Sequence, residues 1–467
     1  MPFSRTRTGC FTCREDGYKC DEQKPFCGRC TRLSKTCKGY GVRLKWQTPQ
    51  STPKSKASKS KRQQRNRSND KTITAPLAPL APLTPLTPTT PSMPFSESQS
   101  PIIKLDPSCI VPNDVSPINR YLLNHWSTTL STMVSMVSAP KNPFLIHLTP
   151  MISHSTALRS VLCSIAASHL AILRHEDSLQ TLATRYRLVG VSSLRRTIQT
   201  DNPELSLATI LMLQVSDRLF TMDSGVDHLS GAKAIINQGD LVVRNSSSAS
   251  FLLSLCSYHD ILASVSRGKS PVFEFDGKFP MEGMESMNEL TSVLQLVGQI
   301  SRMRDQENDD LDARGREIEE ILNALDKSDD AIGDVGHTVQ AYKHAAFIYL
   351  YRVWHNQGAP HPRALKHAKS CLDHLSIVPV TSSLVSAQVW PLWTAGCESI
   401  DSDQRKFVRD RVEAMYEARH LPSLRRIEQD IEEVWKIKDE QRNLIGVDNV
   451  DCIKVILRNR QREADLT

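Results

Sequence analysis

The chain has 467 residues, of which 39% are hydrophobic, and a net charge of +7, so it can bury at least one sizeable core and hold two or three domains. Residues 1–30 lack the apolar segment of a signal peptide, and no uninterrupted run of about 18 apolar residues occurs, so we expect neither secretion nor a membrane span. Clustered cysteines in a chain that stays inside the cell predict metal ligands rather than disulfides.

The N-terminal part of the chain carries most of the positive charge. Residues 1–71 contain 19 Lys and Arg against 5 Asp and Glu, a net +14, whereas the remainder contains 39 against 46, a net −7. A basic head on a mildly acidic body favours a nucleic-acid partner at the head. A basic tail that only aids solubility is the alternative.

Six cysteines fall within this head, with the spacing C-x2-C-x6-C-x6-C-x2-C-x6-C from Cys10 to Cys37. The spacing divides into two equivalent halves, and each contains a C-x2-C pair that can grip one zinc ion from a tight turn. Zinc prefers four ligands, so six thiolates satisfy two ions only if two of them bridge. The duplication suits a two-metal cluster with one bridging sulfur from each half. A single structural zinc with two spare cysteines and an iron–sulfur cluster are the alternatives.

The stretch GCFTCREDGYKCDEQKPFCGRCTRLSKTC resembles the binuclear zinc cluster of fungal transcription factors, which places a short helix in the major groove of double-stranded DNA. The resemblance implies two Zn²⁺ per chain, bridged by Cys10 and Cys27. It also implies that the two sites are completed by Cys13 and Cys20 and by Cys30 and Cys37. A domain this small has little core, so the metal should supply most of its folding free energy.

The short reading helix departs from the family pattern at its centre. Arg14 and Lys19 match the basic residues of that pattern, but the two central positions hold Asp16 and Gly17. A carboxylate can only accept, for example from cytosine N4, and glycine weakens a helix by up to about 1 kcal/mol. We therefore expect DNA binding with altered or relaxed base preference. The alternative is that Asp16 only caps the helix or holds a neighbouring arginine.

Basic residues around the cluster should contact phosphate groups, which position a protein on DNA without reading its sequence. The expected DNA-binding residues are Arg5, Arg7, Arg14, Lys19, Arg43 and Lys45. Further on, the run KRQQRNR is typical of a nuclear import signal, with a solvated basic linker as the alternative. The expected import residues are Lys61, Arg62, Arg65 and Arg67.

Residues 48–115 are expected to form a disordered linker. They are first polar and basic and then proline-rich, in the run APLAPLAPLTPLTPTTPSMP, which favours an extended polyproline spacer. A docking site for a proline-recognising partner is the alternative. No sustained a/d heptad follows the cysteines, so the pattern favours neither a monomer nor a homodimer.

Helical periodicity dominates residues 116–440 and predicts a single all-α domain of roughly ten helices. Apolar residues return on one face between Thr156 and Leu173, and again on both sides of Leu421-Pro422, which should divide two helices. The segments NPFLIHLTPMISHSTALRSVLCSIAASHLAIL, HLSGAKAII, AAFIYLYRVW and VWPLWTAGCESI are similar to a helical regulatory domain of fungal factors. That resemblance implies a domain that modulates activity and contacts partners or effectors. Residues 441–467 form a tail or one more helix.

Catalysis has no support in the sequence. The run ASVSRGKS ends like a phosphate-binding loop at Gly268, but it lacks the first glycine and lies on a segment that looks helical. Five cysteines occur singly on apolar or mixed helical segments, which is typical of buried structural thiols. They are Cys163, Cys256, Cys371, Cys397 and Cys452; Cys109 lies in the linker.

Together these patterns predict four regions: a zinc cluster at 1–47, a linker at 48–115, an all-α regulatory domain at 116–440 and the C-terminal 441–467. We expect a nuclear, zinc-dependent, DNA-binding regulator of RNA polymerase II transcription that works with the transcription machinery or co-regulators. Two alternatives remain. The cluster could be a scaffold with weak or non-specific DNA binding that acts through partner proteins, or the helical domain could be an enzyme, for which the sequence offers no converging titratable groups.

Overall fold

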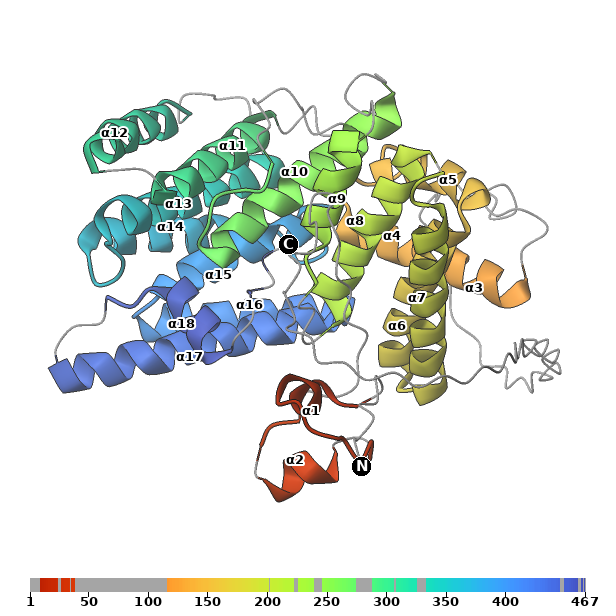
Figure 1. The fold of residues 1–467 in the computed structure, drawn as a ribbon. Coiled ribbons are helices and arrows are strands. Elements are labelled where there is room, and N and C mark those ends of the chain that lie inside the picture. Colours follow the sequence, from red (N-terminus) through yellow and green to blue (C-terminus); the bar gives the residue numbers. More distant parts are fainter. Residues whose placement is uncertain are drawn as a thin grey trace, which may run out of the picture. The chain divides into compact units, whose positions relative to one another are not determined.

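A computed structural model describes two separate parts of the chain, the cysteine cluster and the helical domain (Figure 1). The described residues are 9–23, 27–33, 35–37, 116–200, 202–221, 226–238, 246–273, 288–305, 308–325, 333–445, 449–460, 463–464 and 466. Within them every regular element is a helix, so the expected small cluster followed by a large all-α domain is confirmed. The linker at 48–115 lies outside the described residues.

The cluster contains two short helices, and the helical domain contains the rest. The cluster helices are α1 (Phe11–Glu15) and α2 (Gly28–Arg32). The α-helices of the domain are α3 (Pro117–His125), α4 (Ser131–Val134), α5 (Thr149–His154), α6 (Thr156–Arg174), α7 (Asp177–Thr197), α8 (Pro203–Phe220), α9 (His228–Gln238), α10 (Ser247–Arg267), α11 (Asn288–Arg302), α12 (Asn308–Ala324), α13 (Asp334–His355), α14 (Pro362–Ile377), α15 (Val389–Glu398), α16 (Ser402–Arg419), α17 (Pro422–Ile445) and α18 (Cys452–Asn459). Short π-helical turns lie at Trp126–Leu130 and Phe144–Leu148, and 3₁₀ turns at Met303–Asp305 and Ser383–Gln388.

The prediction of roughly ten helices was too low, because the described residues of the domain hold the sixteen α-helices from α3 to α18. Helices such as α4 and α5 are only 4 and 6 residues long, so their apolar residues cannot complete a helical repeat. The division at Leu421-Pro422 is confirmed, since α16 ends at Arg419 and α17 begins at Pro422. Proline suits the first turn of a helix because it has no N–H to leave unpaired.

Helix α6 forms the centre of the N-terminal half of the domain. It begins at the N-cap Ser155, whose Oγ accepts a hydrogen bond from the Leu158 N–H at 3.1 Å. It pairs with α7, and Gly190 of α7 allows the close approach, because a Cβ there would lie 2.7 Å from Val161 Cγ2. Helix α6 is long and apolar enough to cross a membrane, but 78% of its most apolar 18-residue stretch is buried inside the domain. Its apolar character is therefore accounted for by the core.

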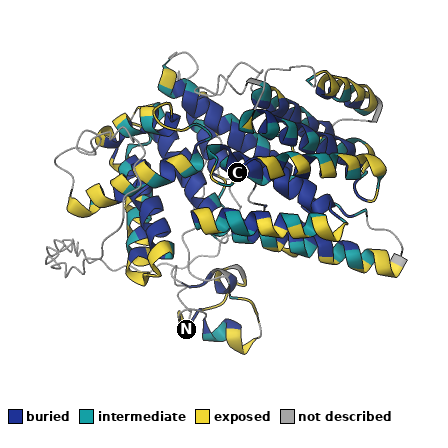
Figure 2. Cartoon of the chain, turned by 180° about the vertical axis from the view of Figure 1, so that it is seen from behind, coloured by how far each residue is buried: buried dark blue, intermediate teal, exposed yellow. Residues whose placement is uncertain are grey.

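Helix α10 connects the two halves of the core, since it packs on α8 and also on α11 (Figure 1). Buried residues concentrate along the helices at the middle of the domain (Figure 2). At its C-terminal end Gly268 adopts a left-handed conformation with φ of 61° and ends the helix. The run ASVSRGKS is thus a helix C-terminus rather than a phosphate-binding loop, which follows a strand.

A buried charged group joins three helices of the C-terminal half. Glu398 of α15 accepts from Arg352 Nη2 of α13 at 2.7 Å and from Lys438 Nζ of α17 at 2.8 Å. All three side chains are at most 4% exposed. Desolvation alone would raise the pKa of Glu398, but the charges of Lys438 and Arg352 overcome it and lower the pKa to about 2. The Glu398 carboxylate is therefore fully ionised at neutral pH.

The hydrophobic core extends past residue 440. Helix α17 continues to Ile445, and buried side chains of α18, including Ile453 and Ile456, belong to the same core as the preceding helices. The sequence left open whether residues 441–467 form a tail or one more helix. The described part of this segment contains the additional helix, α18. The five single cysteines expected in the core are all buried, whereas Cys109 lies outside the described residues.

Candidate zinc centre and nucleic-acid interface

The two halves of the cluster repeat the same backbone arrangement. In each half the first cysteine is the N-cap of a short helix, and its Sγ accepts from the N–H of the cysteine three residues later. The distances are 3.4 Å from Cys13 N to Cys10 Sγ and 3.3 Å from Cys30 N to Cys27 Sγ. The C-x2-C spacing therefore places both sulfurs of a pair on one helical turn.

The third cysteine of each half returns to the first. The Cys10 N–H donates to Cys20 Sγ at 3.3 Å, and the Cys27 N–H donates to Cys37 Sγ at 3.4 Å. Donation of an N–H to sulfur stabilises a thiolate, which is the form that binds zinc. The repeat seen in the spacing is therefore also a repeat in hydrogen bonding.

The six sulfurs fit two zinc ions. They form two sets of four whose Sγ atoms all lie within 4.8 Å of one another: Cys10, Cys13, Cys20 and Cys27, and Cys10, Cys27, Cys30 and Cys37. Zn–S bonds of about 2.3 Å in a tetrahedron place sulfurs about 3.8 Å apart. The shared pair, Cys10 and Cys27, has its Sγ atoms 3.6 Å apart. The sharing of these two residues is the arrangement that a doubly bridged cluster needs.

Burial makes the thiols poor acids in the absence of a cation. Desolvation raises the pKa of the Cys27 thiol to about 12, and it also raises the pKa of Cys10 and Cys30. Metal binding must therefore displace protons from this cluster.

Asp16 holds two basic side chains rather than projecting alone. Its carboxylate accepts from Lys35 Nζ at 2.7 Å and lies 3.7 Å from Arg29 Nη1. The hydrogen bond from Lys35 is the largest cause that lowers the pKa of Asp16. The same residue is the C-cap of α1. Asp16 therefore ends the helix and holds a neighbouring arginine, as considered above, and also a lysine; the expected base preference stays a prediction.

Gly17 lies just after the end of α1, so the expectation that it weakens this helix was wrong. Its φ is 76°, a left-handed conformation that glycine adopts without a steric penalty. The Tyr18 N–H then donates to the Cys13 carbonyl at 2.9 Å, which is the closing bond of a Schellman motif. The second half has the equivalent bond, from Lys35 N to the Cys30 carbonyl at 2.9 Å.

A further acidic residue caps the second helix. Asp21 accepts from the N–H groups of Gly28 and Arg29 at 3.0 and 2.8 Å. These two donors at the start of α2 are therefore already paired within the protein, and we assign no phosphate to them. The sequence analysis did not identify this cap, because Asp21 lies seven residues before the helix, outside the usual N-cap position.

The family of the chain follows from its sequence similarity. A family model described as a fungal specific transcription factor domain matches residues 121–462, which is most of the chain. The chain belongs to this family. A second model, for the fungal Zn(2)-Cys(6) binuclear cluster domain, matches residues 8–47. This fungal transcription factor therefore carries a binuclear cluster domain, and its six cysteines bind two zinc ions.

Curated relatives of this fungal transcription factor match short segments only. White-opaque regulator 2 of Candida albicans is 61% identical over 36 residues, 8% of either chain. Transcriptional regulatory protein moc3 of Schizosaccharomyces pombe is 58% identical over 36 residues, 8% of this chain and 7% of moc3. Arginine metabolism regulation protein II of Saccharomyces cerevisiae is 44% identical over 49 residues, 10% of this chain and 6% of that protein. The chain thus matches less than a tenth of the length of each, and no solved structure matches it.

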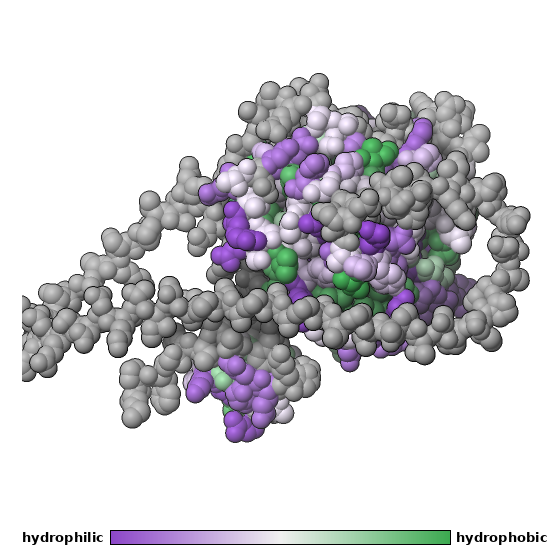
Figure 3. Space-filling model, turned by 90° about the vertical axis from the view of Figure 1, so that its right-hand side faces the viewer, coloured by the Kyte–Doolittle hydropathy of each residue, from purple (hydrophilic) through white to green (hydrophobic). Residues whose placement is uncertain are grey.

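The described part of this transcription factor includes two of the expected DNA-binding residues. Arg14 on α1 and Lys19 after it are both exposed, and the cluster presents a largely hydrophilic surface (Figure 3). The remaining expected DNA-binding and import residues lie outside the described residues; they are Arg5, Arg7, Arg43, Lys45, Lys61, Arg62, Arg65 and Arg67. Their roles stay predictions.

Arg29 is a basic residue of the cluster with a structural role that the sequence did not reveal. Its guanidinium lies over the Tyr18 ring, 4.1 Å from the centroid, and Nη1 donates to Cys13 Sγ at 3.8 Å. Together with its contact to Asp16, these interactions connect the second half of the cluster to the first. No local sequence signal marks such a residue, because its partners belong to the other half.

Proposed function

We propose that this protein regulates RNA polymerase II transcription in the nucleus and that its cluster docks in the major groove of double-stranded DNA. The observation that carries the proposal is the pair of cysteine sets sharing Cys10 and Cys27, with Arg14 and Lys19 exposed on and after α1. The domain limits 1–47, 48–115, 116–440 and 441–467 belong to this proposal. So does the role of the helical domain, which would receive a signal and contact the transcription machinery or co-regulators.

The electrostatics of the cluster make its basic side chains essential. Two zinc ions and six thiolates sum to −2, so the metal centre repels phosphate. Arg14 and Lys19 would offset this repulsion on the α1 side. The proposed contacts from the flanking arginines and lysines would strengthen the attraction to phosphate further. These contacts position the protein on DNA, and we propose that base preference is relaxed because Asp16 faces Lys35 and Arg29 instead of a base.

A second function is favoured by that same Asp16 network. A carboxylate that holds Lys35 and Arg29 withdraws two cations from phosphate binding. The cluster would then be a scaffold with weak or non-specific DNA binding, and the protein would act through partner proteins.

Selection from a random duplex library distinguishes the two functions. The full-length, zinc-loaded protein would be used at about physiological salt, because binding strength and apparent specificity depend on ionic strength. Enrichment of a defined half-site supports groove docking with sequence readout. Binding without enrichment supports the scaffold function. Absence of binding contradicts both DNA-contact proposals.

Two variants test which role each exposed basic residue has in DNA binding. Replacing Lys19 by Ala should weaken binding about equally on all sequences if it contacts phosphate. Replacing Arg14 by Ala should also change the selected sequence if this residue reads a base.

Nuclear import by residues 61–67 and the formation of a homodimer are separate parts of the proposal. Import is tested by fusing the full chain to a fluorescent protein and replacing Lys61, Arg62, Arg65 and Arg67 by Ala. Loss of nuclear accumulation supports the assignment.

Sedimentation of the zinc-loaded chain with and without DNA determines whether it forms a homodimer.

A further inference from the structure

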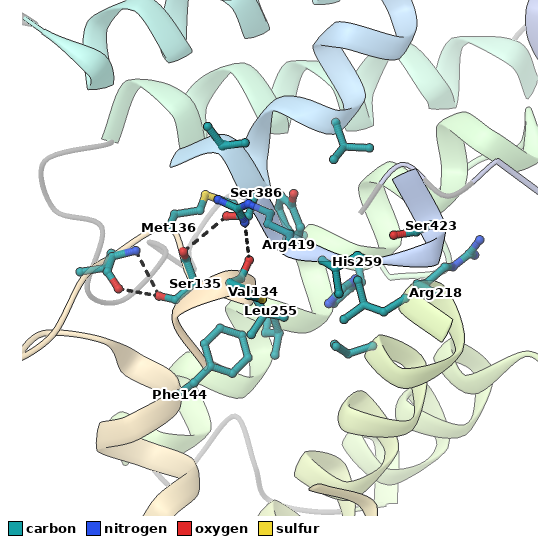
Figure 4. A pocket seen from close by; sticks show the side chains of 18 of the residues that line it. Val134, Ser135, Met136, Phe144, Arg218, Leu255, His259, Ser386, Arg419 and Ser423 are labelled. Carbon is teal, nitrogen blue, oxygen red and sulfur yellow. Dashed lines mark hydrogen bonds between the residues drawn. The ribbon is translucent and has the colours of Figure 1, made fainter. Parts of the chain in front are cut away.

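The helical domain contains an internal cavity that its role as a zinc-cluster factor does not explain. It lies among α8, α10, α15, α16 and α17 and the segment 133–137, and its volume is about 110 Å³ (Figure 4). Apolar side chains form most of its walls; examples are Met133, Val215, Phe251, Leu255, Met415 and Leu424. A dry apolar cavity of about 150 Å³ can hold benzene, so this one suits a compact organic group.

His259 of α10 lines this cavity, and one of its ring nitrogens is buried without a partner. The residue is 6% exposed, and its Nδ1 has no hydrogen-bond partner in the described part of the chain. Desolvation lowers the pKa of His259 to about 3, so the ring is neutral near pH 7 and can donate from one nitrogen and accept at the other. His259 is therefore a neutral polar residue in an otherwise largely apolar wall.

Arg419 provides a buried positive charge in the same wall. It is 8% exposed, and its guanidinium donates to the main-chain oxygens of Met133 at 2.9 Å and Ser382 at 3.3 Å. Among the described residues no carboxylate pairs with it, and the cavity lining contains neither Asp nor Glu. Desolvation lowers the pKa of Arg419 to about 10, so it remains charged at neutral pH. Two of its five donors are used by those oxygens, which leaves others for a ligand.

Two other arginines have a carboxylate partner, whereas the buried Arg411, like Arg419, donates only to neutral oxygens. Arg352 has its counterion in Glu398, and Arg218, which also lines the cavity, pairs with Glu463 at 2.5 Å. A buried cation without an anion is unfavourable, and a carboxylate can accept two parallel hydrogen bonds from a guanidinium. Arg419 differs from Arg411 in lining a cavity, so an anion from outside the protein can reach it there.

We propose that this cavity is a binding site for a compact apolar carboxylate. The acid group pairs with Arg419, and the apolar body lies against Phe251 and Leu255. The volume of about 110 Å³ is smaller than the about 150 Å³ that holds benzene, so a short aliphatic chain fits better than an aromatic ring. Binding would also stabilise the segment 133–137, because Arg419 already holds the Met133 carbonyl.

The test uses the full-length, zinc-loaded protein without DNA, so its outcome does not depend on the proposed DNA function. Calorimetry measures binding of butanoate and hexanoate, each beside its neutral isostere, butanamide and hexanamide. We expect at least one acid to bind at least tenfold more tightly than its amide. The site is refuted if neither acid binds at about 10 mM, or if each amide binds as well as its acid.

Variants on α16 localise the effect. Arg419→Met should abolish the preference for the acid, and Arg419→Lys should reduce it severalfold, because charge remains but the planar fork is lost. Arg411→Met is the matched control: Arg411 lies on the same helix, is also 8% exposed and donates to Val378 O and Gln388 Oε1, but does not line the cavity. Equal loss of preference in the Arg411 and Arg419 variants would contradict the assignment. If Arg419→Met does not fold, the Arg419→Lys comparison decides.

Discussion

Replacing Asp16 by Asn should strengthen binding of this protein to DNA and make it more sensitive to salt. In the cluster the carboxylate lies 2.7 Å from Lys35 Nζ and 3.7 Å from Arg29 Nη1. The amide retains the shape of the side chain and its place as the C-cap of α1, but it removes the negative charge that holds the two cations. Lys35, which is exposed, becomes available to a phosphate, and Arg29 becomes partly available.

The size of the effect follows from counterion release. Each additional phosphate contact steepens the slope of log K against log salt by about 0.9 on duplex DNA, so two released cations steepen it by about 1.8. Relative to 1 M salt, one such contact increases affinity about fivefold at about 0.15 M. We therefore expect non-specific binding to tighten about fivefold if only Lys35 is released, and more if Arg29 follows.

Fluorescence anisotropy on a non-specific duplex between about 0.05 and 0.3 M salt measures this slope. Glu15→Gln is the matched control, because it makes the same change of net charge at the adjacent position. Its slope should change less than half as much. Equal slopes for the two variants, or no change in either, would refute the idea that Asp16 withholds these cations from DNA.

Three further predictions concern stability and metal. Glu398→Gln leaves Arg352 and Lys438 buried without an anion and should lower the free energy of unfolding by about 3–5 kcal/mol in urea titrations, whereas Glu413→Gln, in an exposed pair, should leave the urea midpoint nearly unchanged. The pKa of His259 is lowered from 6.5 to about 3, so the stability associated with its neutral ring is fully present above pH 6.5 and is lost as the pH falls; at pH 5 the loss is about 2 kcal/mol. Glu398 stays ionised in this range, so a melting temperature that does not change between pH 7.5 and 5 would contradict the histidine argument. Chelation of zinc should abolish DNA binding and leave the helical circular dichroism largely intact, with recovery on adding zinc; DNA binding that survives chelation would show that the cluster does not depend on metal.

The metal site was predictable because its information is local. The C-x2-C spacing places two sulfurs on one helical turn, and the duplicated half requires a second ion. The network around Asp16 was not predictable to the same degree, because Lys35 and Arg29 lie 19 and 13 residues away along the chain. Their approach depends on the two halves folding onto a common metal centre.

The helical domain shows the same contrast. Long helices such as α6 and α17 repeat apolar residues often enough to be predicted, whereas helices of one turn do not. The cavity is lined by residues from Met133 to Leu424, so no window of sequence contains it. His259 and Arg419 are ordinary helical residues until the fold brings them into one wall.

Because Cys10 and Cys27 belong to both sulfur sets, modification of these two cysteines has a larger effect on metal binding than modification of the other four. Oxidation or alkylation of either shared thiol removes a ligand from both ions, and each ion would keep three. The same lesion at Cys13 or Cys37 affects one ion only. A cluster whose fold depends on these ions therefore has two points at which a single modified sulfur can disable it as a whole.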